Sequence, residues 1–156
     1  MMKMKRWCAA GLMVILLAAT LCACGKPSGT HTHDLGDYSY TYPNGFAEEG
    51  TGDNYSMEFD ALESDAVLLL YNYANHYETT AESFLEGAEA DAIEQVGPNE
   101  VVLRVTTAWD HCADYYYVGE KLIAWASIQC KTAEEADEWY AALVDGAIRA
   151  KPLDNE

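Results

Sequence analysis

The feature that most constrains the fold of this chain is the apolar run at residues 66–74, AVLLLYNYA. Strands of a half-exposed sheet alternate apolar and polar residues, because successive side chains point to opposite faces. This run is apolar on both faces as far as Leu70. It therefore predicts a strand that is buried on both sides, which the rest of the chain must cover.

Alternation of apolar and polar residues marks further strands on both sides of this run. Aromatic residues alternate with Ser and Thr at 38–42, and apolar residues alternate with polar or acidic ones at 55–60. A period of two predicts a strand in each segment. Three more strands are predicted after the apolar run, at 101–109, 113–118 and 121–129. Gly119-Glu120 suits a two-residue type II′ turn and joins the last two into a hairpin.

Two capping boxes predict where helices begin. The first has Thr79 as N-cap with Glu82 at the third helical position, and the second is Thr132-Ala133-Glu134-Glu135. Apolar residues at helical spacing follow the first box up to Gly97-Pro98, and follow the second until Pro152 stops the helix. The predicted order is βββαβββα. The fold class is therefore α+β, with an antiparallel-dominated sheet of about six strands and two packed helices.

This order resembles a known family. The segment YTYPNGF near the start of the domain and the long amphipathic helix near its end are similar to the PsbP/Mog1-like α/β/α sandwich. The resemblance covers nearly all of residues 37–151 and implies an accessory or binding protein rather than an enzyme, as most members of that fold group are. It transfers no site residue, because no site motif of the family can be matched here. A different two-layer α+β fold is the alternative.

The N-terminal segment has the pattern of an export signal. Lys3, Lys5 and Arg6 precede a run of about 17 residues, from Trp7 to Ala23, that is almost wholly apolar. The run lies at the lower limit of the ~17–25 residues that span a bilayer, and no basic cluster follows it. We expect an export signal; a retained transmembrane helix is the alternative.

The end of this run resembles the lipobox of bacterial lipoproteins. Leu21 stands at −3, Ala23 at −1 and Cys24 at +1, whereas the bulky Leu21 would occupy −1 if Cys22 were modified. The resemblance implies that residues 1–23 are removed and that Cys24 carries the lipid, because a thiol is nucleophilic enough to form the thioether. The protein would then be lipid-anchored at the extracytoplasmic face of a bacterial membrane. An ordinary secretory signal, in which the cysteine is only a small apolar residue, is the alternative.

The remaining chain is expected to hold a flexible tether at 24–36, a single domain at 37–151 and a polar tail at 152–156. Without residues 1–23, six basic residues stand against 26 acidic ones, so the formal charge is −20. Such a charge excludes nucleic acid as a partner, because nucleic-acid binding requires Lys and Arg to neutralise phosphates. It favours solubility outside the cell. A more specific interpretation of this charge is that the protein binds a cationic partner or divalent ions in the envelope.

Cys112 and Cys130 are the other cysteines that remain after export, so a disulfide between them must be considered. With Gly119-Glu120 as the loop, Val118 faces Lys121 and Cys112 faces Ser127. The two cysteines are then offset by three residues, roughly 10 Å at ~3.3 Å per residue, which exceeds the ~7 Å limit for bridging. We expect two separate free thiols, and a shifted register would allow the bond.

Candidate metal ligands and catalytic motifs are few. His31, His33 and Asp34 are ordinary zinc ligands, but they lie in the predicted tether, where nothing preorganises a site. The chain has no Gly-x-Ser-x-Gly, His-Glu-x-x-His or phosphate-binding Gly-Lys-Ser/Thr motif. We therefore expect neither a catalytic residue nor a cofactor.

The tyrosines are the remaining feature. Tyr71 and Tyr73 share a strand face, as do Tyr115 and Tyr117, while Tyr116 points the opposite way. Packing within the sheet is one interpretation, and a ligand-facing patch is the other. The leading hypothesis is a non-catalytic domain that binds an unknown ligand or envelope protein. A small hydrolase or metal-dependent enzyme needs a deep pocket that gathers a histidine with carboxylates, and a solute-binding accessory protein needs a tyrosine-lined groove.

Overall fold

The computed structural model describes residues 29–153, which contain ten strands and two helices. One sheet has the order β1-β2-β10, formed by Thr30–Leu35, Tyr38–Pro43 and Arg149–Pro152. The other has the order β3-β4-β5-β9-β8-β7-β6. Its strands are, in chain order, Thr51–Gly52, Ser56–Asp60, Val67–Ala74, Ala92–Gly97, Glu100–Thr106, His111–Val118 and Leu122–Cys130. The helices are α2 (Ala81–Gly87) and α3 (Ala133–Val144). The predicted α+β class is confirmed, with ten strands in two antiparallel sheets instead of about six in one.

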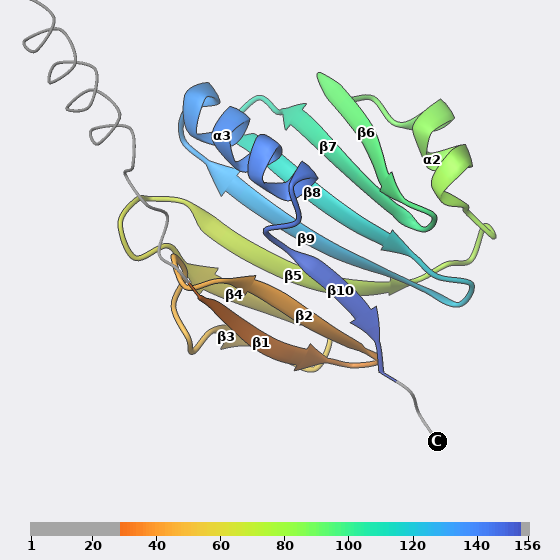
Figure 1. Cartoon of the computed structure of the whole chain (residues 1–156), viewed down its shortest axis with the longest axis horizontal. Coiled ribbons are helices and arrows are strands. Elements are labelled where there is room, and N and C mark those ends of the chain that lie inside the picture. Colours follow the sequence, from red (N-terminus) through yellow and green to blue (C-terminus); the bar gives the residue numbers. More distant parts are fainter. Residues whose placement is uncertain (1–28, 154–156) are drawn as a thin grey trace, which may run out of the picture.

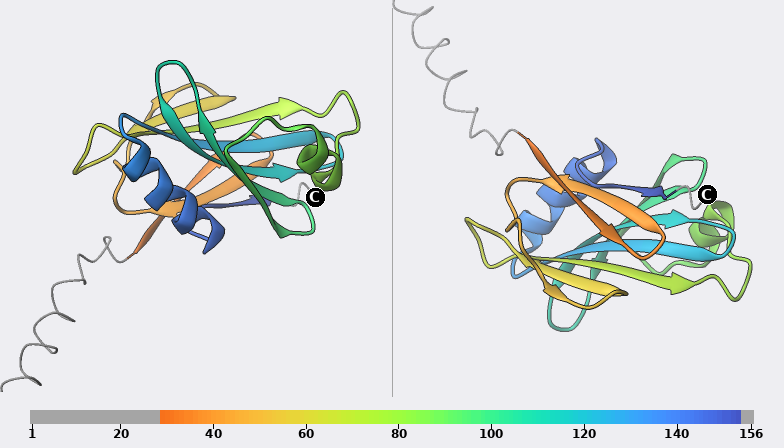
Figure 2. Two further views of the ribbon diagram at one scale, coloured as in Figure 1. Left: turned by 90° about the horizontal axis from the view of Figure 1, so that it is seen from above. Right: turned by 90° about the horizontal axis from the view of Figure 1, so that it is seen from below.

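The three-stranded sheet and α3 both pack on one face of the seven-stranded sheet, here named the inner face (Figures 1 and 2). Their contact forms the main core, to which the small sheet contributes Tyr40 and Tyr42, and α3 contributes Ala136 and Leu143. The opposite, outer face carries a smaller core where α2 packs on β6 and β7. The two faces of one sheet are therefore covered unequally.

The apolar run at 66–74 forms β5, as predicted, but its two faces differ in burial. Leu68 and Leu70 point inward and are fully buried. Val67 and Leu69 point outward and are only half-buried, and Tyr71 remains 37% exposed. The prediction of burial on both sides is thus correct for the inner face alone, because the helix on the outer face does not extend over β5.

The first predicted helix is much shorter than expected. It begins after Thr80, one residue later than predicted, with a capping box that uses Ser83 in place of Glu82. It ends at Gly87, and residues 92–97 form β6, paired with β7. The apolar residues Ile93 and Val96 fit helical spacing, but their branched side chains also suit a strand. Gly97-Pro98 turns a hairpin rather than ending a helix.

Both ends of the predicted domain also require correction. Residues 30–35 form β1 against β2, so the expected tether at 24–36 is wrong for these residues. The second helix begins after Thr132, as predicted, but it ends at Val144. Gly146 follows in the left-handed region at φ 95°, a common helix ending, and the chain returns as β10 along β2. Pro152 therefore ends an edge strand, a position that tolerates its missing N–H.

The predictions about the export signal, Cys22 and the lipid on Cys24 fall outside the described residues. Neither helix within residues 29–153 has the length and apolar character that crossing a bilayer requires.

Candidate binding surface

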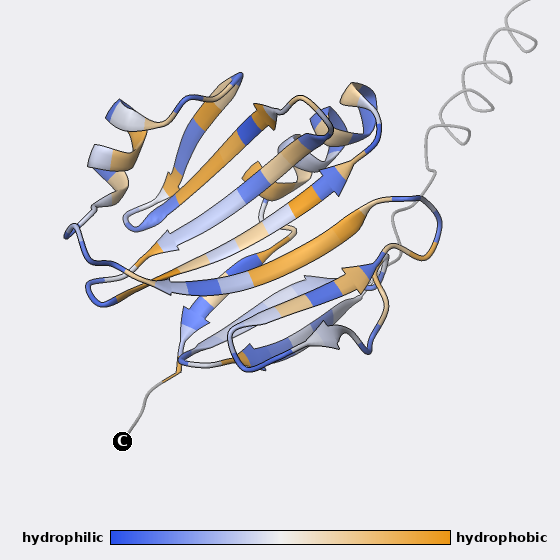
Figure 3. Cartoon of the chain, turned by 180° about the vertical axis from the view of Figure 1, so that it is seen from behind, coloured by the Kyte–Doolittle hydropathy of each residue, from blue (hydrophilic) through white to orange (hydrophobic). Residues whose placement is uncertain are grey.

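The outer face of the seven-stranded sheet is open over β5, β8 and β9. Figure 3 shows this face, with α2 over its β6–β7 side and α3 behind the sheet. Cross-strand pairing arranges the outer side chains in rows. From β7 to β5 these are Val101–Tyr116–Trp125–Tyr71, Leu103–Asp114–Ser127–Leu69 and Val105–Cys112–Gln129–Val67. The open part of the face is therefore aromatic in one row and carries a single carboxyl in the next.

We name Tyr71, Tyr73, Tyr116 and Trp125 the aromatic cluster. The Tyr116 and Trp125 rings stack with centroids 5.9 Å apart and an interplanar angle of 6°. Tyr71 meets Trp125 edge-on at 6.3 Å and stacks with Tyr73 at 6.0 Å. Phe84 of α2 supports the cluster from its far side, 4.6 Å from Tyr116. Contacts between rings hold each plane in place, so the cluster presents preorganised aromatic surface to solvent.

Asp114 lies beside the aromatic cluster and is only 6% exposed. Burial raises the pKa of its carboxyl to about 6, although the Ser127 hydroxyl and the nearby Trp125 indole favour the charged form and oppose this rise. Oδ1 of Asp114 and Nε1 of Trp125 are both buried and have no hydrogen-bond partner among the described residues. The Trp125 indole thus lies near enough to favour the charged carboxylate, but neither atom makes a hydrogen bond of normal geometry, which is uncommon in native interiors.

The charge of Asp114 is not balanced by its surroundings. The three outer rows hold no lysine or arginine. The buried guanidinium of Arg104 belongs to the inner face, where Nε lies 2.8 Å from Asp137 Oδ1 and Nη1 lies 3.8 Å from Asp91 Oδ2. Burial, reinforced by the Asp114 charge, raises the pKa of the Tyr73 and Tyr116 hydroxyls. The site is therefore a buried carboxyl within apolar and neutral polar groups.

The strand faces of the tyrosines agree with the prediction. Tyr71, Tyr73 and Tyr116 point outward, whereas Tyr115 and Tyr117 point into the inner face. Sequence reasoning missed Trp125 and Asp114 as members of the same surface. The correct hairpin register was the signal that could have found them, because it places Trp125 opposite Tyr116 and Ser127 opposite Asp114.

The hairpin register also changes the relation between Cys112 and Cys130. Val118 pairs with Ile123, not with Lys121, so the predicted register is wrong by two residues. Cys112 faces Gln129, and Cys130 faces His111. Directly opposed residues share a face and successive residues do not, so the two thiols point to opposite faces of the sheet. Both are free and buried in the structure.

The predicted metal ligands do not converge. His31 and His33 occupy alternate positions on β1 and pack on aromatic rings, with centroids 5.4 Å from Tyr42 and 5.4 Å from Phe59 respectively. The adjacent Asp34 points to the other side of the strand, where it accepts a hydrogen bond of 2.6 Å from Ser39. Within residues 29–153, no group of three His, Cys, Asp or Glu side chains could hold a metal ion.

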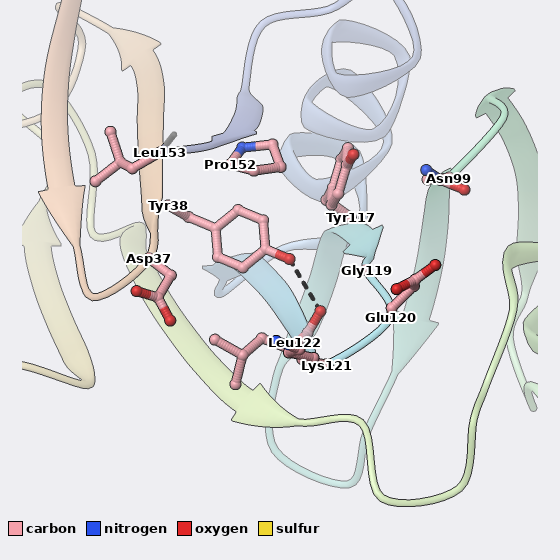
Figure 4. A pocket seen from close by; sticks show the side chains of 10 residues that line it. All are labelled: Asp37, Tyr38, Asn99, Tyr117, Gly119, Glu120, Lys121, Leu122, Pro152 and Leu153. Carbon is pink, nitrogen blue, oxygen red and sulfur yellow. Dashed lines mark hydrogen bonds between the residues drawn. The ribbon is translucent and has the colours of Figure 1, made fainter. Parts of the chain in front are cut away.

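A hollow lies at the end of the two sheets, next to the β8–β9 hairpin (Figure 4). It has a volume of about 420 Å³, and its walls include Tyr38, Tyr117 and Leu122. Tyr38 and Tyr117 pack with centroids 5.6 Å apart, and the Tyr38 hydroxyl donates to the Leu122 carbonyl at 2.9 Å. Burial, with smaller contributions from Tyr117 and Asp37, raises the pKa of Tyr38 to about 12. The hydroxyl is thus occupied, and the hollow offers two tyrosine rings and aliphatic surface beside charged side chains such as Glu120 and Lys121.

Comparisons with known proteins assign the chain to no family. No family model matches it, and no curated protein is similar to it in sequence. A crystal structure from Bacteroides thetaiotaomicron VPI-5482 is 12% identical with a TM-score of 0.49. The match covers 77% of this chain and 47% of that one, so this chain spans about half of its length. The solution structure of PsbP (CyanoP) from Synechocystis sp. PCC 6803 is 12% identical with a TM-score of 0.48, and the match covers 83% of this chain and 98% of that one. At these values, membership of the PsbP-like family stays a prediction.

Proposed function

We propose that this chain is a non-catalytic binding domain, anchored at the extracytoplasmic face of a bacterial membrane by a lipid on Cys24. Its binding surface is the aromatic cluster with Asp114. The basic, apolar and small residues that end at Cys24 support the anchor. The open outer face of the sheet supports the binding surface.

One observation carries this proposal: a buried carboxyl with one unsatisfied oxygen lies next to a partly exposed aromatic cluster. A buried charge without a partner costs stability, and so does a buried indole N–H without an acceptor. Proteins retain such costs where function uses the groups, since binding sites trade stability for activity. Tyr and Trp on an exposed surface are also the residues that most often anchor an interface.

The arrangement offers little for nucleophilic catalysis. Cys112 and Ser127 are the nucleophile types on the outer rows. Burial together with Asp114 and Asp110 raises the pKa of the Cys112 thiol, which disfavours the reactive thiolate. None of the three rows contains a histidine that could act as its base. The lining of the hollow in Figure 4 contains no histidine either.

A second candidate function is solute binding at that hollow. Its volume of about 420 Å³ falls in the ~300–1,000 Å³ range of small-molecule sites. Its tyrosine walls are the feature expected of a solute-binding accessory protein. If this is the site, Tyr117→Ala abolishes solute binding and Tyr71→Ala leaves it unchanged, as isothermal titration calorimetry would show.

The binding surface can be tested by site-specific photocrosslinking on intact cells. A photoreactive phenylalanine analogue replaces Tyr71 in the cluster or, as the matched control, Tyr77, which is 93% exposed outside it. We expect a discrete adduct from position 71 that is absent from position 77. The same adducts from both positions, or none from position 71, would contradict the proposed surface.

The anchor has a separate test. Cys24→Ala should block lipid attachment, so the protein should no longer mature into its membrane-bound form. Cys22→Ala is the control and should change neither processing nor fractionation. If the Cys24→Ala protein matures and partitions into membranes as the wild type does, the anchor is not on this cysteine.

A further inference from the structure

The binding surface lacks the positive charge that its carboxyl would need for balance. Asp114 is buried on the outer face, where the Ser127 hydroxyl and the Trp125 indole favour its charged form, but the rows around it hold no cation. Buried carboxylates in proteins are ordinarily paired with a cation or fully hydrogen-bonded. The unsatisfied Oδ1 is therefore one hydrogen-bond position that a cationic donor from outside the domain would fill.

The aromatic cluster specifies the shape of that donor. The stacked pair Tyr116 and Trp125 and the perpendicular Tyr71 present ring faces and edges within a few ångströms of one another. A planar guanidinium stacks on such rings and carries five N–H donors, whereas an ammonium offers a compact, strongly hydrated charge. Arginine therefore uses both the rings and the carboxyl better than lysine does.

The location of the site favours a side chain of a protein over a free solute. Small-molecule sites are concave and enclose most of the ligand. The cluster instead lies on the open face of a sheet, apart from the hollow of Figure 4 (Figure 3). Open surfaces with exposed Tyr and Trp are typical of protein interfaces, in which arginine is an enriched partner. The formal charge of −17 would attract a basic segment from a distance.

We infer that the outer face binds an arginine side chain presented by a protein partner, with the guanidinium stacked on the aromatic cluster and hydrogen-bonded to Asp114. This inference rests on the proposed function, because it names the ligand class of the same surface. Oδ1 is buried in the structure, so the donor must displace a neighbouring side chain to reach it.

The test is a titration of the ¹⁵N-labelled full chain, in a non-ionic detergent, followed by nuclear magnetic resonance. One probe is the peptide acetyl-Gly-Gly-Arg-Gly-Gly-amide, and its neutral counterpart carries citrulline, which keeps the shape of arginine without the charge. We expect the arginine peptide to move the Trp125 indole resonance and amides of β5, β8 and β9. Citrulline should bind at least tenfold more weakly, and a lysine peptide should fall between the two.

Two carboxyl variants distinguish a specific role of Asp114 in binding from attraction by the overall negative charge. Asp114→Asn keeps the side-chain shape and should weaken arginine-peptide binding at least tenfold. Asp60→Asn removes the same charge from an exposed position on the outer side of β4, and it should change binding less than twofold. Equal effects of the two variants would overturn the role of Asp114 and leave only long-range attraction.

The remaining outcomes distinguish the inference from the function beneath it. Equal binding of arginine and citrulline peptides would overturn the ligand class. The ligand class would also be overturned if the peptides caused no shifts while position 71 still crosslinked on cells. The binding surface itself would then stand. If neither shifts nor crosslinks occur, both proposals fail. Broadening of the cluster resonances with protein concentration alone would make a second copy of the chain the occupant and overturn the inference.

Discussion

The two faces of the seven-stranded sheet use the same residue types with opposite results. On the inner face, the Tyr40 hydroxyl donates to Asn72 and the Tyr115 hydroxyl donates to Glu100 at 2.7 Å, while both rings are fully buried. On the outer face, Tyr71 is 37% exposed and Asp114 has an unsatisfied oxygen. The comparison teaches that a tyrosine becomes a core residue or a surface feature according to the layer that covers it.

The difference follows from the size of those layers. The inner face is covered by three strands and by α3, which has 12 residues. The outer face receives α2, which has seven residues and contacts β6 and β7. Helices this short bury little apolar surface, so β5, β8 and β9 keep an open side. The outer side of β5, β8 and β9 is therefore open because α2 is too short to cover it, and not because of the residues in these strands.

The largest expected effect comes from removing an inner aromatic ring. Tyr115→Ala should lower the free energy of unfolding by about 3–5 kcal/mol, because it leaves a cavity and removes a hydrogen-bond partner from the Glu100 carboxylate and from the Ala150 N–H. Chemical denaturation measures the change. Tyr115→Phe keeps the ring and should lose only about 1–2 kcal/mol. If both variants lost the same free energy of unfolding, the hydrogen bonds of the hydroxyl, and not the packing of the ring, would be the main contribution of Tyr115 to stability.

The alkylation rates of the two cysteines allow the two faces of the sheet to be compared. Burial raises the pKa of Cys130, on the inner face, to about 12, so native alkylation should be roughly a thousandfold slower than for an ordinary thiol. Cys112, on the outer face, is 8% exposed and should react faster than Cys130. Mass spectrometry of iodoacetamide-labelled peptides measures both rates. A gain of 2 Da on reduction that maps to these two cysteines would contradict the opposite-face geometry.

The Asp114 carboxyl should make stability depend on pH. Its pKa of about 6 lies above the unfolded value of ~3.9, so the native state holds this proton more tightly. The stability that the proton contributes is fully present below about pH 4 and is lost as pH rises through 6. We expect Asp114→Asn to be more stable than wild type by about 1–3 kcal/mol at pH 8, and equal to it near pH 4. Denaturation at both pH values measures the difference, and a pH-independent difference would show that the carboxyl does not titrate as described.

Much of the fold could be predicted because local patterns and tertiary packing agree there. The alternation at 38–42 and the capping box at Thr132 both led to the correct elements. The errors occurred where one pattern fits two structures. Ala92, Ile93 and Val96 have helical spacing, yet Ala92 and Ile93 pair with β7 and Val96 lies at a register shift of the same strand. His31 and His33 looked like part of a polar tether, but their rings pack on Tyr42 and Phe59.

The candidate site was harder to predict because it depends on register. The shared face of Tyr71 and Tyr73 follows from the period of a single strand. The positions of Trp125 and Asp114 depend on how β9 pairs with both β5 and β8. The hairpin loop extends beyond Gly119-Glu120, and this moved every cross-strand partner by two residues. No property of one strand could show that a carboxyl and an indole would both be left unsatisfied.

The smallest expected stability effect is also the most direct test of the comparison. Tyr71→Ala removes a ring that solvent already reaches, so the free energy of unfolding should fall by less than ~1 kcal/mol. The same variant should lose the arginine-peptide response, since Tyr71 closes one side of the aromatic cluster. Calorimetric unfolding and peptide titration of one sample measure both quantities. If the free energy of unfolding fell as much as in Tyr115→Ala and peptide binding stayed intact, the outer aromatics would be core residues. The two faces would then differ only in the degree of burial.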